Sequence, residues 1–231
     1  GYWADVGSLE GYREVHEDIL DGKAMIYIPG ARTKDDVWVG PGATIDPTAE
    51  ISPKAVIGAN TTIRAGAKIG PYSVIGDNCL VGYDAQTEHS IVWNDSFVGK
   101  WSRVSGAVLC RSVDIRAGAR VEQGAVIGDE SVVGHGAAVG NDVQVYPFKR
   151  IDAGAFVNSS LIWESRGVRS LFGPDGIAGL VSIDITPDLG LRVAQAFGSL
   201  LPARSHVVVS RDSSAAARMV KRAVAAGLNF T

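Results

Sequence analysis

Two histidines have surroundings that fit acid–base chemistry. His135 lies between two glycines in residues 133–136 (VGHG), and His89 lies in residues 83–90, where the repeating pattern described below is interrupted. An imidazole titrates near neutral pH, so either side chain has the chemistry of a general base that deprotonates a hydroxyl or an amine. The ordinary alternative, which we favour, is an exposed polar residue without a catalytic role.

Other common chemical motifs are absent from the sequence. Cys79 and Cys110 are the only cysteines and form no C-x-x-C pair, so neither a disulfide framework nor a zinc site is indicated. No G-x-x-x-x-G-K-[ST] phosphate loop occurs. The net charge of −3 gives no basic field for nucleic acid or an anionic membrane, and no apolar run approaches the ~18 residues of a membrane span. We expect a reducing, cytoplasmic compartment.

The elements that must position these side chains are repeats. Glycine accounts for 28 of 231 residues, about 12% against a typical ~7%. Large aliphatic residues recur every sixth position in two blocks: Val39, Ile45, Ile51, Ile57, Ile63, Ile69, Ile75 and Val81, then Ile115, Val121, Ile127, Val133, Val139, Val145, Ile151 and Val157. Four positions after each aliphatic residue of the first block comes a small residue, from Ala43 to Ala85.

A period of six fits neither a helix nor a long alternating strand. It fits short strands that each end at a tight corner, with the aliphatic residue inward and the small residue at the turn. Glycines such as Gly42 and Gly118 follow the aliphatic residue by three positions, where a bend needs a positive φ. Between the blocks Ile91, Phe97 and Leu109 roughly keep the spacing, and Arg103 breaks it.

This pattern resembles the hexapeptide repeat of left-handed parallel β-helices, in which three hexapeptides form one coil. The resemblance implies about seven coils over residues 37–163, each burying its aliphatic side chains by stacking on its neighbours. Four tryptophans fall in this region: Trp38, Trp93, Trp101 and Trp163. They either contact another domain or subunit or cap the ends of coils.

The N-terminal residues resemble a second family. Residues 1–7 (GYWADVG) match the G-[YF]-W-x-D-[IV]-G segment near the end of the catalytic domain of sugar nucleotidyltransferases. In that family the aspartate is one of two carboxylates that hold Mg²⁺ between the phosphates, so the resemblance assigns a metal ligand to Asp5. A surface aspartate beside a helix cap is the alternative. Residues 8–22 follow as a predicted amphipathic helix, with Ser8 as N-cap and Gly22 as the stop.

The C-terminal residues predict the start of an α/β domain. The expected order is an extended piece at 171–183, a helix opened by Thr186 and Pro187, a buried strand at 206–210 and a helix at about 213–228. Because about 60 residues cannot complete such a sheet, we expect this domain to be partial.

Two motifs in this part resemble the phosphohexomutases. Residues 172–179 (FGPDGIAG) are similar to the F-G-T-x-G-I-R-G opening of that family, and 210–212 (SRD) to its G-R-D strand end. By this resemblance Arg211 is a phosphate-binding residue, although an ion pair with nearby acids explains it equally well. Ala178 stands where the family has its first arginine, which removes a phosphate-binding cation and puts mutase activity in doubt.

The order of these parts resembles bacterial fusion proteins of the mannose-1-phosphate guanylyltransferase family. The expected fold is mainly β, a left-handed parallel β-helix followed by the incomplete α/β start of a phosphohexomutase-like domain. The expected parts are a nucleotidyltransferase tail, a connector, the β-helix, a linker and the partial domain I, at 1–23, 24–36, 37–163, 164–170 and 171–231.

The resemblance implies that the parent protein converts mannose 1-phosphate and GTP to GDP-mannose and pyrophosphate with Mg²⁺, and self-associates through the β-helix. Gly1 is not an initiator methionine, so we expect an internal segment of a longer chain, inactive alone because the other catalytic parts lie outside it. One alternative is a hexapeptide-repeat acyltransferase with His135 or His89 as base. Another is a non-catalytic oligomerisation scaffold.

Overall fold

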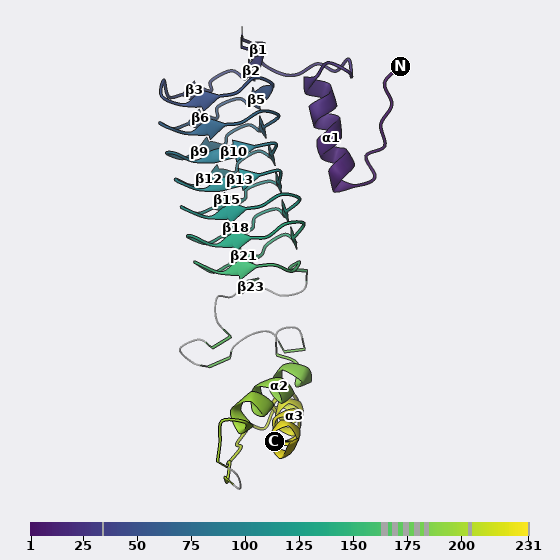
Figure 1. Ribbon diagram of the computed structural model, residues 1–231, viewed down its shortest axis with the longest axis vertical. Helices are drawn as coiled ribbons and strands as arrows, with labels where there is room; N and C mark the ends of the chain where they lie inside the picture. Colours follow the sequence, from purple (N-terminus) through teal and green to yellow (C-terminus); the bar gives the residue numbers. More distant parts are fainter. Residues whose placement is uncertain are drawn as a thin grey trace. The chain divides into compact units, whose positions relative to one another are not determined.

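The computed structural model describes residues 1–33, 35–162, 171–172, 176–177, 181–182, 185–202 and 205–230, and the backbone of 166–167. Two compact units divide the chain: a first unit over Gly1–Ile162 with Arg166–Gly167, and a second unit in the residues from 171 onward (Figure 1). Of the expected positions, Trp163, most of the linker at 164–170, Ala178 and most of the extended piece at 171–183 lie outside the described residues. Within the predicted linker, Arg166–Gly167 form a strand that pairs with Arg150–Ile151.

The first unit is a left-handed parallel β-helix with three sheets along its length. Sheet 1 contains β1 (Ala31–Arg32), β2 (Val37–Val39), β5 (Ala55–Ile57), β8 (Val74–Ile75), β11 (Ile91–Val92), β14 (Val108–Leu109), β17 (Val126–Ile127) and β20 (Gln144–Val145). Sheet 2 contains β3 (Thr44–Ile45), β6 (Thr62–Ile63), β9 (Leu80–Val81), β12 (Phe97–Val98), β15 (Asp114–Ile115), β18 (Val132–Val133), β21 (Arg150–Ile151) and β23 (Arg166–Gly167). Sheet 3 contains β4 (Glu50–Ile51), β7 (Lys68–Ile69), β10 (Gln86–Glu88), β13 (Arg103–Ser105), β16 (Arg120–Val121), β19 (Ala138–Val139) and β22 (Phe156–Val157).

Each coil runs from sheet 1 to sheet 2 to sheet 3 and then returns to sheet 1 one level on. We name the three edges of the prism the 1–2, 2–3 and 3–1 corners. All strand pairs between coils are parallel, and β1 pairs with β2 in the antiparallel direction at the end of sheet 1. This antiparallel pair covers part of an edge that would otherwise offer free backbone groups to another strand.

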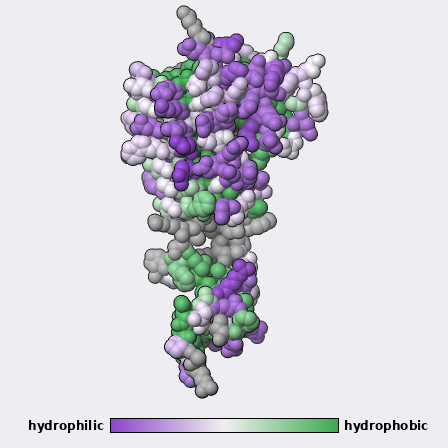
Figure 2. All heavy atoms as spheres, in the orientation of Figure 1, coloured by the Kyte–Doolittle hydropathy of each residue, from purple (hydrophilic) through white to green (hydrophobic). Residues whose placement is uncertain are grey.

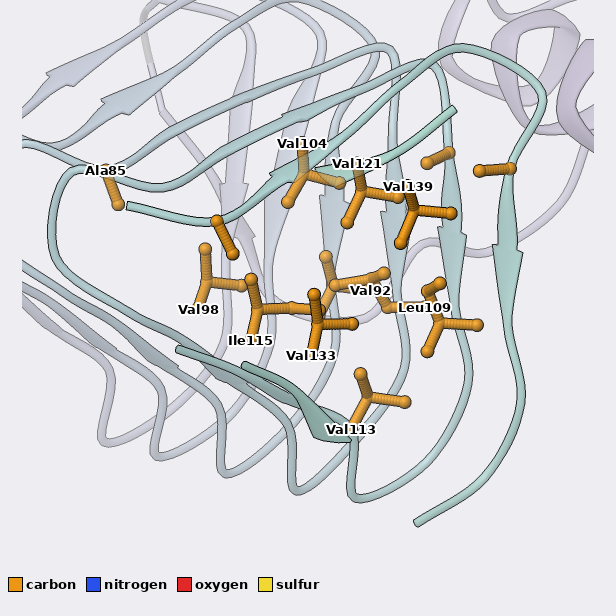
Figure 3. Close-up of a cluster of buried hydrophobic side chains, with 14 of the residues drawn as sticks. Ala85, Val92, Val98, Val104, Leu109, Val113, Ile115, Val121, Val133 and Val139 are labelled. Carbon is orange, nitrogen blue, oxygen red and sulfur yellow. The ribbon is translucent and has the colours of Figure 1, made fainter. Parts of the chain in front are cut away.

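The core is the inside of the prism (Figure 3). The predicted inward residues Ile63 and Ile127 are 1% and 0% exposed, which confirms the register in both blocks. Small buried residues such as Ala55 and Ala67 fill the corners. On the face of the first unit seen in Figure 2 hydrophilic side chains predominate, with apolar ones between them. Stacking of coils therefore supplies the burial that a single coil lacks.

The corners adopt the backbone conformation that the glycine positions predicted. Gly42 and Gly118 have φ of 73° and 69°. The same corner positions in other coils carry residues with side chains at positive φ, for example Asn60 at 56° and Asp84 at 53°. Asparagine and aspartate tolerate this left-handed region better than most residues.

The expected spacing between the two blocks is wrong by one residue in two coils. Ile75 pairs with Val92, which pairs with Leu109, so these coils have 17 residues, whereas Ile57 pairs with Ile75 over 18. The six-residue spacing expects the inward side chains of these coils at Ile91, Phe97 and Arg103. In the structure the inward side chains are those of the next residues, Val92, Val98 and Val104. Apolar residues stand on both sides of the β11 and β12 backbone, so the sequence pattern could not distinguish the two faces.

The second unit contains two helices that pack against each other, α2 (Pro187–Gly198) and α3 (Ala215–Phe230). Thr186 caps α2 as predicted, by accepting a hydrogen bond from the Leu189 N–H. The predicted buried strand at 206–210 is wrong: these residues form no strand, and Val208 is 94% exposed. A strand exists only through pairing, and this segment pairs with none of the described residues.

Among the described residues, no helix combines the length and apolar character needed to cross a membrane.

Candidate functional site

The first helix, α1 (Leu9–Leu20), lies along the 3–1 corner of the β-helix (Figure 1). Ser8 is its N-cap, as predicted, and accepts a hydrogen bond from the Gly11 N–H at 3.0 Å. The helix lies between the two predicted ends: Asp21 is its C-cap, and Gly22, the predicted stop, follows at φ 75°.

Three side chains spaced four residues apart connect α1 to successive coils. Arg13 donates a hydrogen bond to the backbone oxygen of Gly106, and Glu17 Oε1 lies 3.1 Å from His89 Nδ1. Asp21, just after the helix, accepts a hydrogen bond from the Tyr72 hydroxyl at 3.0 Å, on the next corner, and pairs with Lys54 on the one beyond it. Four residues advance ~6 Å along an α-helix and coils lie ~4.8 Å apart, so one face of α1 meets one corner after another.

The two shortened coils lie where α1 docks. In each, one residue is missing from the 3–1 corner: Thr87 to Val92 spans five positions, where Ile69 to Ile75 spans six. The shortened corners are those of His89 and Gly106, the partners of Glu17 and Arg13. We name these two corners with Lys54 and Tyr72 the α1 seat.

Side chains on the outside of sheet 1 are buried at the same level. Ile91 and Val108 face outward, because their neighbours Val92 and Leu109 face the core, and yet they are 4% and 3% exposed. Tyr12 of α1 accepts a hydrogen bond from Trp93 Nε1 at 3.1 Å, directly after β11. Burial and specific polar contacts therefore both hold α1 against this corner, and burial raises the pKa of Tyr12.

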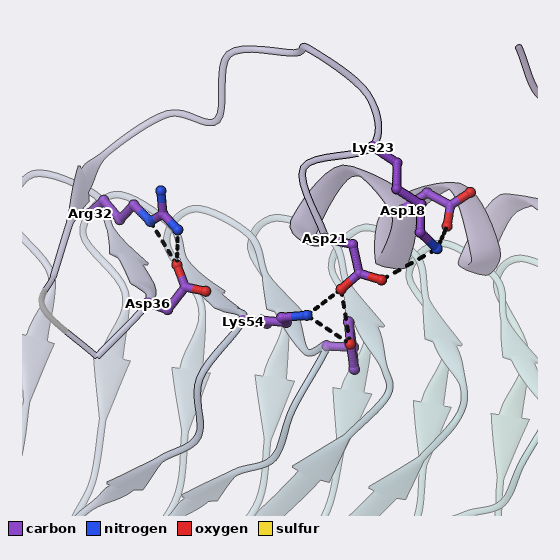
Figure 4. A network of polar contacts seen from close by, with 7 residues as sticks. Asp18, Asp21, Lys23, Arg32, Asp36 and Lys54 are labelled. Carbon is purple, nitrogen blue, oxygen red and sulfur yellow. Dashed lines mark hydrogen bonds and ion pairs between the residues drawn. The ribbon is translucent and has the colours of Figure 1, made fainter. Parts of the chain in front are cut away.

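Ion pairs at the C-terminal end of α1 shift the pKa values of its carboxylates (Figure 4). Hydrogen bonds from Lys54 and then from Tyr72 lower the pKa of Asp21, and the same bond with Asp21 raises the pKa of Lys54. Hydrogen bonds from Lys23 and Tyr2 lower the pKa of Asp18. The pair of Asp21 and Lys54 therefore stays charged at neutral pH and reinforces the docking of the helix, whereas Asp18 connects α1 to the segments before and after it.

The N-terminal segment that carries Asp5 is connected to the same helix. The Tyr2 hydroxyl donates to Asp18 Oδ2 at 2.9 Å, and a Cβ placed on Gly11 would lie 2.9 Å from the Asp5 backbone oxygen. Glycine at position 11 thus allows the segment to fold back over the start of α1. The Asp5 side chain itself is exposed.

Asp5 has an oxygen donor suited to Mg²⁺, but the described residues include no group of three side chains that could hold a metal ion. On its own, this carboxylate supplies one ligand of such a site. Its assignment as a metal ligand stays a prediction.

Two adjoining cavities lie between α1 and the β-helix. The larger, of about 570 Å³, is lined by Leu9, Glu10, Arg13, Gln123, Gly124, Asn141, Asp142 and Gln144. The smaller, of about 380 Å³, is lined by Glu10, Arg13, Glu14, Glu17, Glu88, His89, Ser105, Gly106 and Gln123. Carboxylates predominate over cations in the smaller cavity, so it favours cationic surfaces over phosphates.

The structure separates the two candidate bases. His89 lies in the α1 seat, against Glu17 and with its ring 5.4 Å from that of Tyr72, a position that gives it a structural role. His135 lies exposed on the 2–3 corner. Neither is brought next to Asp5 by any contact among the described residues, and their roles as bases stay predictions.

Arg211 is exposed in the second unit, and its guanidinium donates to the backbone oxygen of Asp212. Asp212 in turn accepts from the Ser214 N–H at 2.8 Å, just before α3. This turn leads into the helix, as the resemblance predicted, but phosphate binding by Arg211 stays a prediction.

Comparison with known families supports both halves of this architecture. Residues 34–139 match the family model of the EIF2B subunit epsilon LbH domain, and residues 169–230 match phosphoglucomutase/phosphomannomutase alpha/beta/alpha domain I. The chain joins a hexapeptide-repeat β-helix to a phosphomutase-like segment. This is the fusion that the sequence motifs predicted.

Two curated mutases each match about a quarter of the chain. Phosphoglucosamine mutase of Rhodococcus erythropolis is 45% identical over 64 residues, which cover 26% of this chain and 14% of that protein. Phosphoglucomutase/phosphomannomutase of Thermococcus kodakarensis is 40% identical over 65 residues, which again cover 26% of this chain and 14% of that protein. The chain thus spans about 14% of the length of these relatives.

Two solved structures are similar to the chain with TM-scores below 0.5. The acetyltransferase domain of PglB from Neisseria gonorrhoeae is 23% identical, with a TM-score of 0.35 over 65% of this chain and 60% of that one. UDP-N-acetylglucosamine acyltransferase from Campylobacter jejuni is 16% identical, with a TM-score of 0.31; the match covers 83% of this chain and 95% of that one. Likeness at this level carries no argument about activity.

Proposed function

We propose that this chain belongs to a sugar-nucleotide-forming nucleotidyltransferase, in which the β-helix is the scaffold that holds the catalytic domain. The parent reaction would convert mannose 1-phosphate and GTP to GDP-mannose and pyrophosphate. The observation that supports it is the docking of α1: residues 1–20, which resemble the end of such a catalytic domain, are joined to the β-helix by Arg13, Glu17 and Tyr12. A docked helix of this kind fixes where the preceding domain stands.

In this proposal Asp5 is one carboxylate ligand of Mg²⁺, with its partner in the preceding domain. The metal would neutralise charge that develops between the phosphates. Asp5 would hold that ion in place, and Tyr2 would hold the segment through its hydrogen bond to Asp18. The chain alone would bind nucleotide poorly, because one carboxylate contributes little without the rest of the site.

The first test is Asp5→Asn in the full-length protein. Asparagine keeps the shape and one oxygen but removes the negative charge, so kcat for GDP-mannose formation should fall about 10²-fold, roughly 2.7 kcal/mol of transition-state stabilisation. Stability should hardly change, because Asp5 is exposed. Asp46→Asn is the control: Asp46 is a half-buried aspartate of the β-helix that accepts a hydrogen bond from the Thr48 N–H, and the variant should keep the parental kcat. A parental kcat in Asp5→Asn at saturating Mg²⁺ would rule out the assignment.

The acyltransferase alternative makes a different prediction for the chain alone. Under it, the 231-residue chain would consume acetyl-CoA with a sugar acceptor, and His135→Ala or His89→Ala would abolish the reaction. Under the proposal above, the chain shows no such turnover and no nucleotidyl transfer or mutase activity. The exposed position of His135 is the one observation that keeps this alternative open.

A further inference from the structure

An aromatic and basic surface lies on the 2–3 corner and the adjoining part of sheet 3. It consists of Tyr83, Lys100, Trp101, Arg103 and Arg120, which we name the basic patch. The side chains of Trp101 and Tyr83 are 60% and 52% exposed. Lys100 Nζ lies 4.4 Å from the centroid of the indole, and both arginines are exposed on the outside of sheet 3.

Two features of the basic patch work against the stability of the isolated chain. Arg103 and Arg120 are direct partners on adjacent strands, and like charges in that position repel. Neither forms an ion pair with any described residue. Trp101 adopts φ of 57°, which is unfavourable for a bulky residue, while the next coil has Gly118 at this position.

Repulsion between like charges on adjacent strands is relieved when a surface of opposite charge covers them. Tryptophan, tyrosine and arginine are also the residues that contribute most to protein interfaces. The 2–3 corner is a projecting edge, and none of the cavities described above includes a residue of the basic patch. A protein surface of opposite charge therefore fits it better than a small ligand does.

The smaller cavity beside α1 provides such a surface. Glu10, Glu14, Glu17 and Glu88 line it, against the single guanidinium of Arg13 and a histidine, and we name it the acidic groove. Glu10 and Glu14 are exposed and take no part in the docking of α1. The acidic groove is therefore a concave surface that carries two carboxylates, those of Glu10 and Glu14, not used in the docking of α1.

The basic patch and the acidic groove lie at the same level of the prism, on the two edges of sheet 3. Trp101 and Arg103 belong to the coil of β11, β12 and β13, and this coil begins after His89 and ends before Gly106, the partners of α1. A second copy rotated about an axis parallel to the β-helix can therefore place its groove against this patch without a shift along the axis. Repetition of one rotation can close a ring.

We propose that the basic patch of one copy binds the acidic groove of a second copy of this chain. The proposal rests on the scaffold role inferred above and not on the reaction. The repulsion between Arg103 and Arg120 is then relieved by carboxylates of the neighbour, and the exposed indole of Trp101 enters the groove.

The test is sedimentation velocity of the 231-residue chain from about 1 to about 100 micromolar. We expect concentration-dependent association that weakens at about 1 M salt, where charges are screened within about 3 Å. Trp101→Gly should weaken association at least tenfold while keeping the fold, because glycine suits the positive φ. Phe148→Gly is the matched control: Phe148 is 71% exposed at φ 62° on the 1–2 corner, and its loss should leave association unchanged.

Charge reversal tests the pairing itself. Arg120→Glu and Glu14→Arg should each weaken association at least tenfold, and the double variant should restore it. Circular dichroism and melting temperature would confirm that each variant is folded. A chain that stays monomeric at every concentration, or a double variant that fails to recover, would overturn the proposal. Neither result depends on the nucleotidyltransferase assay, so the two proposals fail separately.

Discussion

Small polar side chains at the 1–2 corner complete the hydrogen bonding of the turns. Thr61 Oγ1 donates to the Gly76 backbone oxygen at 2.7 Å and accepts from the Cys79 N–H at 3.0 Å. On the same corner further along the β-helix, Ser96 Oγ accepts a hydrogen bond from the Val113 N–H of the following coil at 3.2 Å. The sequence shows that these positions are small, but the hydrogen bonds that make them polar depend on partners about a coil away.

Cys79 should be an inert thiol in the folded chain. Burial raises its pKa to about 11, and its Sγ donates to the Trp93 backbone oxygen at 3.2 Å. At pH 8 the thiolate fraction is then roughly 100-fold or more below that of an ordinary cysteine, so alkylation should slow by at least that factor. The check is iodoacetamide labelling followed by mass spectrometry.

Cys110, half-buried with a pKa that burial also raises, serves as the internal comparison. Both thiols should react at similar rates after unfolding in urea. If native Cys79 is labelled as fast as the unfolded chain, its assignment to the buried corner is wrong.

At the scale of elements, the sequence predicted what depends on local pattern and missed what depends on pairing. The six-residue period predicted the β-helix, and Ser8 and Thr186 predicted where α1 and α2 begin. The α1 seat was not predicted, because Glu17 and His89 are 72 residues apart. One sequence feature does indicate the seat: the interruption of the repeat at 83–90 ends in the first shortened corner, that of His89.

The shortened corners should determine whether α1 docks. Insertion of one glycine between Glu88 and His89 restores six positions from Thr87 to Val92 and pushes this corner outward by up to ~3.5 Å. The Glu17 contact should then be lost. Amide hydrogen exchange in α1 should accelerate at least roughly tenfold, while the strands of the β-helix keep their protection.

The matched control is a glycine inserted between Ala59 and Asn60, at a 1–2 corner away from α1. It disturbs one coil to a similar degree but leaves the α1 seat intact, so exchange in α1 should stay near the parental rate. Equal acceleration in both variants would show that α1 responds to general destabilisation of the coils and not to the shape of its seat.

At the scale of the whole molecule, the two units depend on different kinds of stabilisation. The β-helix buries its residues through neighbouring coils, so its stability is close to a sum of contacts between adjacent coils. In the second unit α2 and α3 approach closely, and a Cβ on Gly227 would lie 2.5 Å from the Leu191 backbone oxygen. That contact requires glycine and is local to the helix pair.

A charge in the core should therefore act on a few coils first. Ile63 is 1% exposed on β6, whose neighbours are β3 and β9. Ile63→Asp loses about 1.5–3 kcal/mol of apolar burial and places a carboxylate where no described residue can pair with it. The melting temperature of the first unit should fall by about 10 °C or more, with hydrogen exchange fastest in β3, β6 and β9.

Thr62→Asp is the matched control, because Thr62 precedes Ile63 on the same strand and faces outward. A surface substitution of this kind changes stability by about 0.5 kcal/mol or less, so its melting temperature should stay within about 2 °C of the parent. The comparison isolates the direction in which one residue points, since the two variants add the same charge one position apart. Equal melting temperatures for the two variants would mean that Ile63 does not face the core, and that the register of the whole first block is wrong.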